Sequence, residues 1–246
     1  MSKYVINKRN ITNVILFLER RFKEEMEKYK VIEIKKNVLA NNDELAKKVR
    51  EDVLSKNVFL LNLMSSPGSG KTTTLVRTIE CLKKDFKIGI IEADIDSDVD
   101  ALTISKSNVK VIQLHTGGMC HVDANMTKFG LEELGVEGLD LVVLENIGNL
   151  VCPASFDTGA TKNVMILSVP EGDDKPLKYP KMFKIVDVLL INKIDAIDYF
   201  DFDLEAVQKR AKEINPDILV LPISAKKGDG FDPWISWLKN QLKGNR

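Results

Sequence analysis

The stretch SSPGSGKTTT, residues 65–74, constrains the fold most, because it follows the apolar run VFLLNLM and precedes a helical pattern. A strand that enters a glycine-rich loop ending in Gly-Lys-Thr, followed by a helix, is the P-loop arrangement. The strict pattern has a further Gly where this chain has Ser65. The remaining glycines, Gly68 and Gly70, let backbone N–H groups point at phosphate oxygens, and the helix N-terminus adds partial positive charge. We therefore expect a phosphate-binding loop rather than a simple glycine turn.

Apolar strands and amphipathic helices alternate along the rest of the chain. Strands are predicted at 58–64, 87–94, 109–114, 140–146, 163–169, 187–193 and 218–224, and helices at 72–84, 124–134, 204–214 and 233–243. Nearly continuous apolar strands are typical of a parallel sheet that is covered on both faces. The sequence thus predicts an α/β fold, a three-layer P-loop NTPase with a mostly parallel central sheet flanked by helices.

Two further helices are predicted before the first strand. Residues 11–30 place apolar residues first and charges after them, and residues 41–56 carry Leu45, Val49 and Val53 on one face. Asn41 or Asn42 is suited to cap the second of these helices. A chain of 246 residues fits one large α/β domain with a small appendage. We expect an N-terminal helical extension at 1–56 and a nucleotide-binding domain at 57–246.

The composition excludes several classes of partner. Lys plus Arg and Asp plus Glu each number 36, so no basic excess points to nucleic acid. The N-terminus has no apolar core of the secretory type, and no apolar run is long enough to span a membrane. Three cysteines do not make a disulfide framework. We expect a soluble, cytoplasmic protein.

The segment NKID, residues 192–195, ends another apolar run and indicates which base is bound. Asp195 can accept hydrogen bonds from N1–H and the 2-amino group of guanine, whereas adenine offers no such pair of donors. The aliphatic part of Lys193 can stack on the base, and the later SAK resembles the GTPase loop that contacts guanine O6. We predict GTP as the nucleotide, bound by Pro67, Gly68, Ser69, Gly70, Lys71, Thr72, Thr73, Asn192, Lys193, Asp195, Ser224, Ala225 and Lys226.

A third motif, LENIG, supplies Glu145 and Gly148 at the end of another strand. Glu145 is predicted to contact Mg²⁺ through water, and the Gly148 N–H to meet the γ-phosphate. Lys71 would bridge β- and γ-phosphate oxygens, while the Thr72 hydroxyl would hold Mg²⁺. The predicted catalytic set is Lys71, Thr72, Asp94, Glu145 and Gly148, of which Thr72, Asp94 and Glu145 surround Mg²⁺.

Three more acidic residues follow Asp94 in EADIDSDVDA. Asp100 is a further candidate for the Mg²⁺ shell, and Asp96 and Asp98 are interpreted as solvated loop charges. No Arg or Gln in this region is an evident catalytic finger. Charge stabilisation and positioning of water supply most of the rate in such sites, so we expect slow hydrolysis of GTP to GDP and phosphate. A slow rate suits a switch.

Cys120, His121 and Cys152 admit three interpretations. A nucleophile with its base is disfavoured, because neighbours on an extended segment point to opposite faces. Core packing fits Cys81 in the helix after the P-loop, and a structural role fits His115. Two thiolates and one imidazole suit an open Zn²⁺ or Ni²⁺ site. Cys152 follows Gly148 by four residues, and Pro153 favours an extended Cys152. The residue types alone leave the metal and packing interpretations open.

These stretches together resemble the HypB family, the hydrogenase nickel-incorporation GTPases of the SIMIBI class of P-loop GTPases. The resemblance rests on five segments: NLMSSPGSGKTTTL, TGGMCHVDA, LENIGNLVCPASFDTG, SVPEGDDKPLKYP and LLINKID. The family's Ser-Ser-Pro loop accounts for Ser65, and its ExxG accounts for Glu145. Residues 1–36 contain neither Cys nor His, so the N-terminal nickel store of many members is not expected. Gly118 stands where members often have Lys.

The resemblance implies a Ni²⁺ or Zn²⁺ site at Cys120, His121 and Cys152, and a homodimer that forms with GTP. It also implies nickel delivery during nickel–iron hydrogenase maturation, with the small zinc protein HypA as a partner and the hydrogenase large subunit as an indirect one. Three alternatives remain. The urease relative UreG has Cys-Pro-His where this chain has Ala154 after Pro153. A regulatory GTPase with structural cysteines and a zinc-stabilised scaffold are the others.

Overall fold

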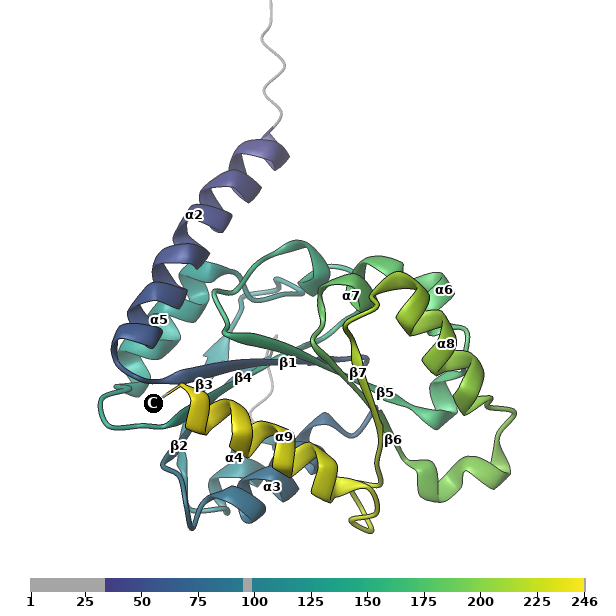
Figure 1. Ribbon diagram of the computed structural model, residues 1–246. Helices are drawn as coiled ribbons and strands as arrows, with labels where there is room; N and C mark the ends of the chain where they lie inside the picture. The colour runs from purple at the N-terminus through teal and green to yellow at the C-terminus, as the bar shows by residue number, and fades with distance from the viewer. Residues whose placement is uncertain (1–33, 95–98, 246) are drawn as a thin grey trace, which may run out of the picture. The chain divides into compact units, whose positions relative to one another are not determined.

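A seven-stranded sheet forms the centre of the protein in the computed structural model, which describes residues 34–94 and 99–245 (Figure 1). Its strands lie in the order β3-β2-β4-β1-β5-β6-β7, and every pair of neighbours runs parallel. All seven predicted strands are confirmed, and the described sheet is wholly rather than mostly parallel. The bounds are β1 Phe59–Ser65, β2 Ile88–Asp94, β3 Lys110–His115, β4 Leu141–Gly148, β5 Lys162–Ser168, β6 Val188–Asn192 and β7 Leu219–Pro222.

The helices between the strands agree with the sequence where their apolar periodicity is long. The α-helices are α2 Ile34–Ser55, α3 Lys71–Leu82, α4 Val99–Ser105, α5 Ala124–Leu134, α6 Lys175–Lys178, α7 Pro180–Ile185, α8 Leu204–Ile214 and α9 Phe231–Gly244. Three short 3-10 helices join them: η1 Pro153–Ser155, η2 Val169–Glu171 and η3 Ile194–Tyr199. The predictions did not include α4, α6 or α7. The helix predicted at 11–30 lies outside the described residues.

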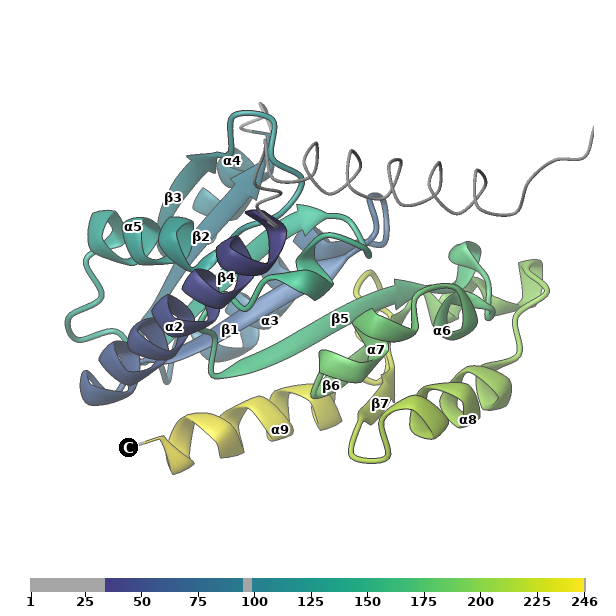
Figure 2. The same ribbon diagram turned by 90° about the horizontal axis from the view of Figure 1, so that it is seen from above.

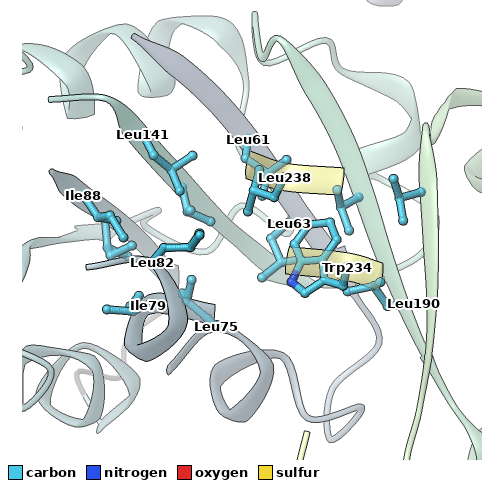
Figure 3. Close-up of a cluster of buried hydrophobic side chains, with 14 of the residues drawn as sticks. Leu61, Leu63, Leu75, Ile79, Leu82, Ile88, Leu141, Leu190, Trp234 and Leu238 are labelled. Carbon is cyan, nitrogen blue, oxygen red and sulfur yellow. The ribbon is translucent and has the colours of Figure 1, made fainter. Parts of the chain in front are cut away.

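Helices cover both faces of the sheet, which makes three layers. Figures 1 and 2 show α3, α4 and α9 on one face, and α5, α7 and α8 on the other. On the first face, Leu61 and Leu63 of β1 pack with Ile79 of α3 and with Trp234 and Leu238 of α9 (Figure 3). Burying each such side chain stabilises the fold by about 1.5–3 kcal/mol. Burial on both faces explains why β1 is apolar at nearly every position.

The second predicted helix is longer than expected, and from residue 39 on it lies in the sheet's own compact unit. The chain divides into two units, 1–38 and 39–246, whereas we expected a division at 56/57. Val49 and Val53 of α2 pack with Val58 and Leu60 in the core of the second unit. Because α2 begins at Ile34, Asn42 lies inside the helix and is not its N-cap. None of the helices in the described residues is both long and apolar enough to cross a membrane.

Candidate functional site

The P-loop connects β1 to α3 as the sequence predicts. Gly68 and Gly70 have φ angles of 75° and 90°, a backbone conformation that favours glycine. A Cβ on Gly70 would lie 2.5 Å from Nδ2 of Asn192, so this glycine also allows a close approach between loop and β6. The helix α3 starts at Lys71, which leaves its first N–H groups facing the loop. The loop therefore has the geometry of an anion site.

A cavity of about 640 Å³ opens beside this loop at the carboxyl ends of the strands. Parallel α/β sheets bind their ligands at this edge. The lining brings together three of the predicted motifs, with Asp100 as well: Ser65, Ser66, Pro67, Gly68, Gly70, Lys71, Thr72, Thr73, Asp94, Asp100, Ile147, Gly148 and Lys193. Gly148 lies directly against the loop, since a Cβ there would meet the Pro67 backbone at 3.1 Å. A γ-phosphate held by the loop would thus reach Gly148.

Glu145 is the charged centre of this site. Its carboxylate is fully buried, 3.2 Å from Nζ of Lys71, and accepts a 3.1 Å hydrogen bond from the Thr72 hydroxyl. Burial raises the pKa of Glu145, and the Lys71 ammonium opposes that rise. Its Oε2 has no hydrogen-bond partner in the described part of the chain. Thr72 and Asp94 line the cavity, and Glu145 is bonded to Thr72 behind it, so these oxygen donors fit Mg²⁺.

Glu92 is a second buried carboxyl group at this edge, and the sequence reasoning missed it. It pairs in register with Glu145 on the neighbouring strand, so both side chains lie on the same face of the sheet. Burial, with Glu145 as the next cause, raises the pKa of Glu92 to about 8. The available signal was the spacing of two between Glu92 and Asp94, which places them on one face of β2.

The NKID and SAK segments are joined to the P-loop by hydrogen bonds. Asn192 donates to the Ser69 carbonyl at 2.9 Å, and its Oδ1 accepts from Ala225 N–H at 2.9 Å. Lys193 donates to the Gly68 carbonyl at 2.6 Å. The structure thus brings the three predicted base- and phosphate-binding segments into one network.

Asp195 and the end of the SAK segment complete this side of the site. The Ser224 hydroxyl donates to Asp195 at 2.7 Å, and this hydrogen bond holds the pKa of Asp195 below its usual value. An ionised Asp195 is the acceptor that guanine requires. Lys226 is exposed, and its carbonyl accepts from Arg77 at 2.9 Å. The Ser69 hydroxyl is buried without a partner among the described residues.

Cys120, His121 and Cys152 lie together as one group. Their ligand atoms are all within 4.8 Å of one another, and the two Sγ atoms are 3.0 Å apart. The His121 ring stacks on Phe156 with centroids 3.8 Å apart. The His121 Nδ1 is buried, and no partner for it occurs in the described ranges. Two sulfurs, one imidazole and an unpartnered buried nitrogen fit a borderline or soft metal ion such as Ni²⁺ or Zn²⁺.

The environment controls the protonation of these ligands. Burial lowers the pKa of His121, which keeps the ring neutral, although the Asp123 carboxylate opposes that effect. The contact with Cys152, followed by burial, raises the pKa of the Cys120 thiol. A metal ion must therefore displace a proton from Cys120 when it binds.

Several details of the cysteine predictions were wrong. Residues around Cys120 and His121 form a bend, not an extended segment, so both can reach one point. Cys152 is helical, with φ −65° and ψ −47°, because it caps η1, which has Pro153 as its first residue. Cys81 is exposed, since it lies on the solvent side of α3, and it is not a core residue. His115 is also exposed at the end of β3.

The metal-ligand group is bonded to the segment that carries Gly148. Asn149 follows Gly148 directly, and its side chain donates to the Cys120 carbonyl at 3.1 Å. Asn146, on the same strand, accepts from the Val122 N–H at 3.2 Å. Movement at the end of β4 would therefore act on both Cys120 and Cys152.

The comparisons with known proteins agree with this arrangement. The family model described as CobW/HypB/UreG, nucleotide-binding domain, matches residues 59–222. The hydrogenase maturation factor HypB of Azotobacter chroococcum mcd 1 is 46% identical over 214 residues, which cover 86% of this chain and 70% of the relative. The crystal structure of HypB from Helicobacter pylori in complex with nickel is 37% identical, with a TM-score of 0.78 over 83% of this chain and 96% of that one. HypB from Archaeoglobus fulgidus has the same identity and TM-score, over 83% and 100%.

Proposed function

The chain belongs to the CobW/HypB/UreG family, in its branch of HypB hydrogenase maturation factors, and from this premise we propose that it is a nickel metallochaperone. It binds GTP, hydrolyses it slowly to GDP and phosphate, and assists nickel insertion into nickel–iron hydrogenase. The observation that supports this function best is the Cys120–His121–Cys152 group, hydrogen-bonded through Asn149 to the end of β4. A metal site beside a nucleotide sensor is what a nucleotide-controlled metal carrier requires.

The residues around the cavity have distinct tasks in GTP binding and hydrolysis. Lys71 holds β- and γ-phosphate oxygens, and the Gly148 N–H reads the γ-phosphate. Thr72, Asp94 and Glu145 would hold Mg²⁺, which neutralises phosphate charge when it is bound. Lys71 pairs with Glu145 and also lines the cavity, so its ammonium can pair with phosphate in place of this carboxylate.

The two sites are coupled through β4 and the residues that follow it. When the γ-phosphate engages Gly148, the adjoining Asn149 and Cys152 take a fixed position relative to Cys120. Hydrolysis releases this contact and changes the affinity for Ni²⁺ or Zn²⁺. Thermodynamic linkage makes the effect reciprocal, so a bound metal ion also changes the affinity for nucleotide.

The proposed mechanism also includes a homodimer and two partner proteins. The ligand group has three protein donors, one fewer than a closed tetrahedral site. A homodimer that forms with GTP brings two such groups together in the cytoplasm. A HypA-like zinc protein receives the nickel ion and passes it to the hydrogenase large subunit.

Metal titrations of wild type and Cys120→Ala, each with GDP and with a non-hydrolysable GTP analogue, test this function. Ni²⁺ and Zn²⁺ should bind wild type with affinities that differ between the two nucleotides, and Cys120→Ala should lose most of this binding. Identical affinities in both nucleotide states would contradict the coupling. Metal-independent dimerisation with intact partner binding in Cys152→Ala would instead favour a regulatory GTPase whose cysteines are structural.

The remaining alternatives predict other results in the same assays. A urease-type metallochaperone would deliver nickel to urease in place of hydrogenase in a reconstituted maturation assay. Chelator-induced unfolding without any GTP turnover would favour a zinc-stabilised scaffold.

A further inference from the structure

Asn42 of α2 contacts both segments that carry the proposed metal ligands. Its Nδ2 donates to the Asp157 carbonyl at 2.9 Å, and its Oδ1 accepts from the Ala124 N–H at 2.9 Å. Ala124 is the first residue of α5 and follows His121 by three residues. Asp157 follows Cys152 by five residues. One side chain, only 8% exposed, therefore bridges the two halves of the ligand group.

These bonds satisfy backbone groups that would otherwise lack partners. The first N–H groups of a helix have no partner within it, and the side chain of the cap residue Asp123 accepts from the Met126 N–H. Asn42 supplies the acceptor for Ala124 at a buried position. A buried N–H or C=O without a hydrogen-bond partner destabilises the fold. The backbone groups of both segments therefore stay bonded to the Asn42 side chain.

Arg50, two turns further along α2, fixes the same segment after Cys152. Its guanidinium donates to both carboxylate oxygens of Asp157, at 2.7 and 2.8 Å, and to the Ala160 carbonyl at 2.9 Å. Both bonds to Asp157 come from the one nitrogen Nη2, and these charge-assisted bonds, together with the Nε bond to Ala160, restrain the position of the segment. Phe156, the neighbour of Asp157, in turn stacks on His121.

We propose that Asn42, supported by Arg50, is a positioning residue that sets the distance between the Cys120–His121 segment and the Cys152 segment. The inference rests on the proposed metal-binding function. Three asparagines around the Cys120–His121–Cys152 group hold its two segments in place through different hydrogen bonds. Asn146 and Asn149 tie the Cys120–His121 segment to β4, whereas Asn42 ties both ligand segments to α2.

The first test measures the apoprotein, with Cys81→Ser as background so that Cys120 and Cys152 are the remaining thiols. Diamide oxidises the two thiols to an intramolecular disulfide, taking up two electrons and two protons, and its rate reports how often the sulfurs meet. Asn42→Ala should slow this rate about tenfold, because partly freed ligand segments lose their fixed orientation. An unchanged rate would overturn the inference.

The second test measures Co²⁺ binding through its thiolate charge-transfer absorption. Asn42→Ala should weaken binding by about tenfold, as loss of an outer contact does at other metal sites. Asn42→Asp keeps the acceptor for Ala124 and loses the donor to Asp157, so it should fall between Asn42→Ala and wild type. It also replaces Asn42→Ala if that variant does not fold.

Asn215→Ala is the matched control, because Asn215 donates to the carbonyls of Phe183 and Val186 and contacts neither ligand segment. It should lower the melting temperature while leaving the Co²⁺ affinity and the oxidation rate as in wild type. Equal losses of affinity in Asn215→Ala and Asn42→Ala would overturn the positioning role. Failure of the wild type to bind any metal would contradict the proposed function, and the oxidation rate would still decide the role of Asn42.

Discussion

In the function that we propose, Asp195 is the residue on which the choice of base depends. Its carboxylate is ionised and oriented by the Ser224 hydroxyl, and Ala225 is held by Asn192 beside it. Guanine offers two donors to this acceptor, whereas the 2-oxo group of xanthine would repel it. The side chain therefore selects by charge and hydrogen-bonding pattern.

We predict that Asp195→Asn lowers the affinity for GTP by roughly 10- to 100-fold and raises the affinity for xanthosine triphosphate. The Asn amide can donate to the 2-oxo group, and it loses one acceptor for guanine. Isothermal titration with both nucleotides measures the exchange. An equal loss of affinity for both nucleotides would contradict the prediction, because it would show that the substitution had disrupted the loop and had not changed the base specificity.

Glu92 gives stability a dependence on pH. Its pKa is 4.5 in the unfolded chain and about 8 in the folded one. Between these values the unfolded carboxyl group is ionised while the folded one keeps its proton, so stability falls as the pH rises through this window. We predict that Glu92→Gln, a neutral side chain of the same shape, removes this loss.

The quantity to compare is the free energy of unfolding of Glu92→Gln minus that of wild type. This difference should be larger at about pH 8 than at about pH 5, by at least about 1 kcal/mol. Urea denaturation of the nucleotide-free protein with a chelator measures the difference. Glu133→Gln, at an exposed position, should show the same small difference at both pH values. A constant gap between Glu92→Gln and wild type would contradict the prediction.

Residues of the nucleotide site could be predicted because their chemistry is concentrated in short motifs. Lys71, Thr72 and Glu145 are adjacent in space, as their motifs imply. Glu92 and Asn42 could not be recognised in that way, because their roles arise from contacts with residues distant in the chain. A lone polar residue in an apolar strand or helix looks the same in sequence whether it is exposed or buried.

At the level of elements, the strands and the long helices were predictable from periodicity alone. The bounds of α5 and α8 agree with the prediction at both ends, since Asp123 and Asp203 cap them with their side chains. The helices α4, α6 and α7 have four to seven residues, too few for an apolar repeat to emerge. The start of α2 was missed because Asn41 and Asn42 offer a plausible N-cap inside the helix.

Gly159 allows the loop after Cys152 to lie against α2. It has a φ of 80°, and a Cβ there would meet the Val49 side chain at 2.7 Å and the Ala46 carbonyl at 2.8 Å. We predict that Gly159→Ala lowers the free energy of unfolding by about 2–3 kcal/mol, from backbone strain and from this clash together. Denaturant unfolding followed by circular dichroism measures the loss.

Gly138→Ala separates the two causes. Gly138 has a similar φ of 76°, but a Cβ there would have nothing within 4 Å. This variant should therefore lose only the cost of the left-handed backbone, about 1–2 kcal/mol. Equal losses for Gly138→Ala and Gly159→Ala would mean that the loop yields without cost and that its contact with α2 is loose.

At the level of the whole molecule, the carboxyl edge of the sheet carries both functions. The P-loop follows β1, the proposed γ-phosphate contact Gly148 is the last residue of β4, and the Cys120–His121 segment follows β3. The order β3-β2-β4-β1 makes β1 and β4 neighbours and leaves only β2 between β4 and β3, and this order could not be predicted from the sequence. Local patterns specify strands, whereas their sequence of neighbours depends on packing between distant segments. The fold therefore provides a route for the proposed connection between nucleotide and metal, which no single motif reveals.

Two exposed apolar side chains lie beside the proposed metal ligands at this edge. Met119 precedes Cys120 and is 41% exposed, and Val151 precedes Cys152 and is 59% exposed. In the dimer that we propose, both would be buried between two copies. We predict that Val151→Asp abolishes GTP-dependent dimerisation, because two like charges would face each other in the interface.

Sedimentation with a GTP analogue should show a monomer for Val151→Asp and a dimer for wild type, while the monomer's nucleotide affinity stays within about twofold. Leu54→Asp is the control. Leu54 is 43% exposed near the end of α2, just before β1, so it lies at the amino edge of the sheet. This variant should still dimerise. Dimerisation of Val151→Asp at wild-type strength would place the interface on another surface, and metal binding could then not be shared between the two ligand groups.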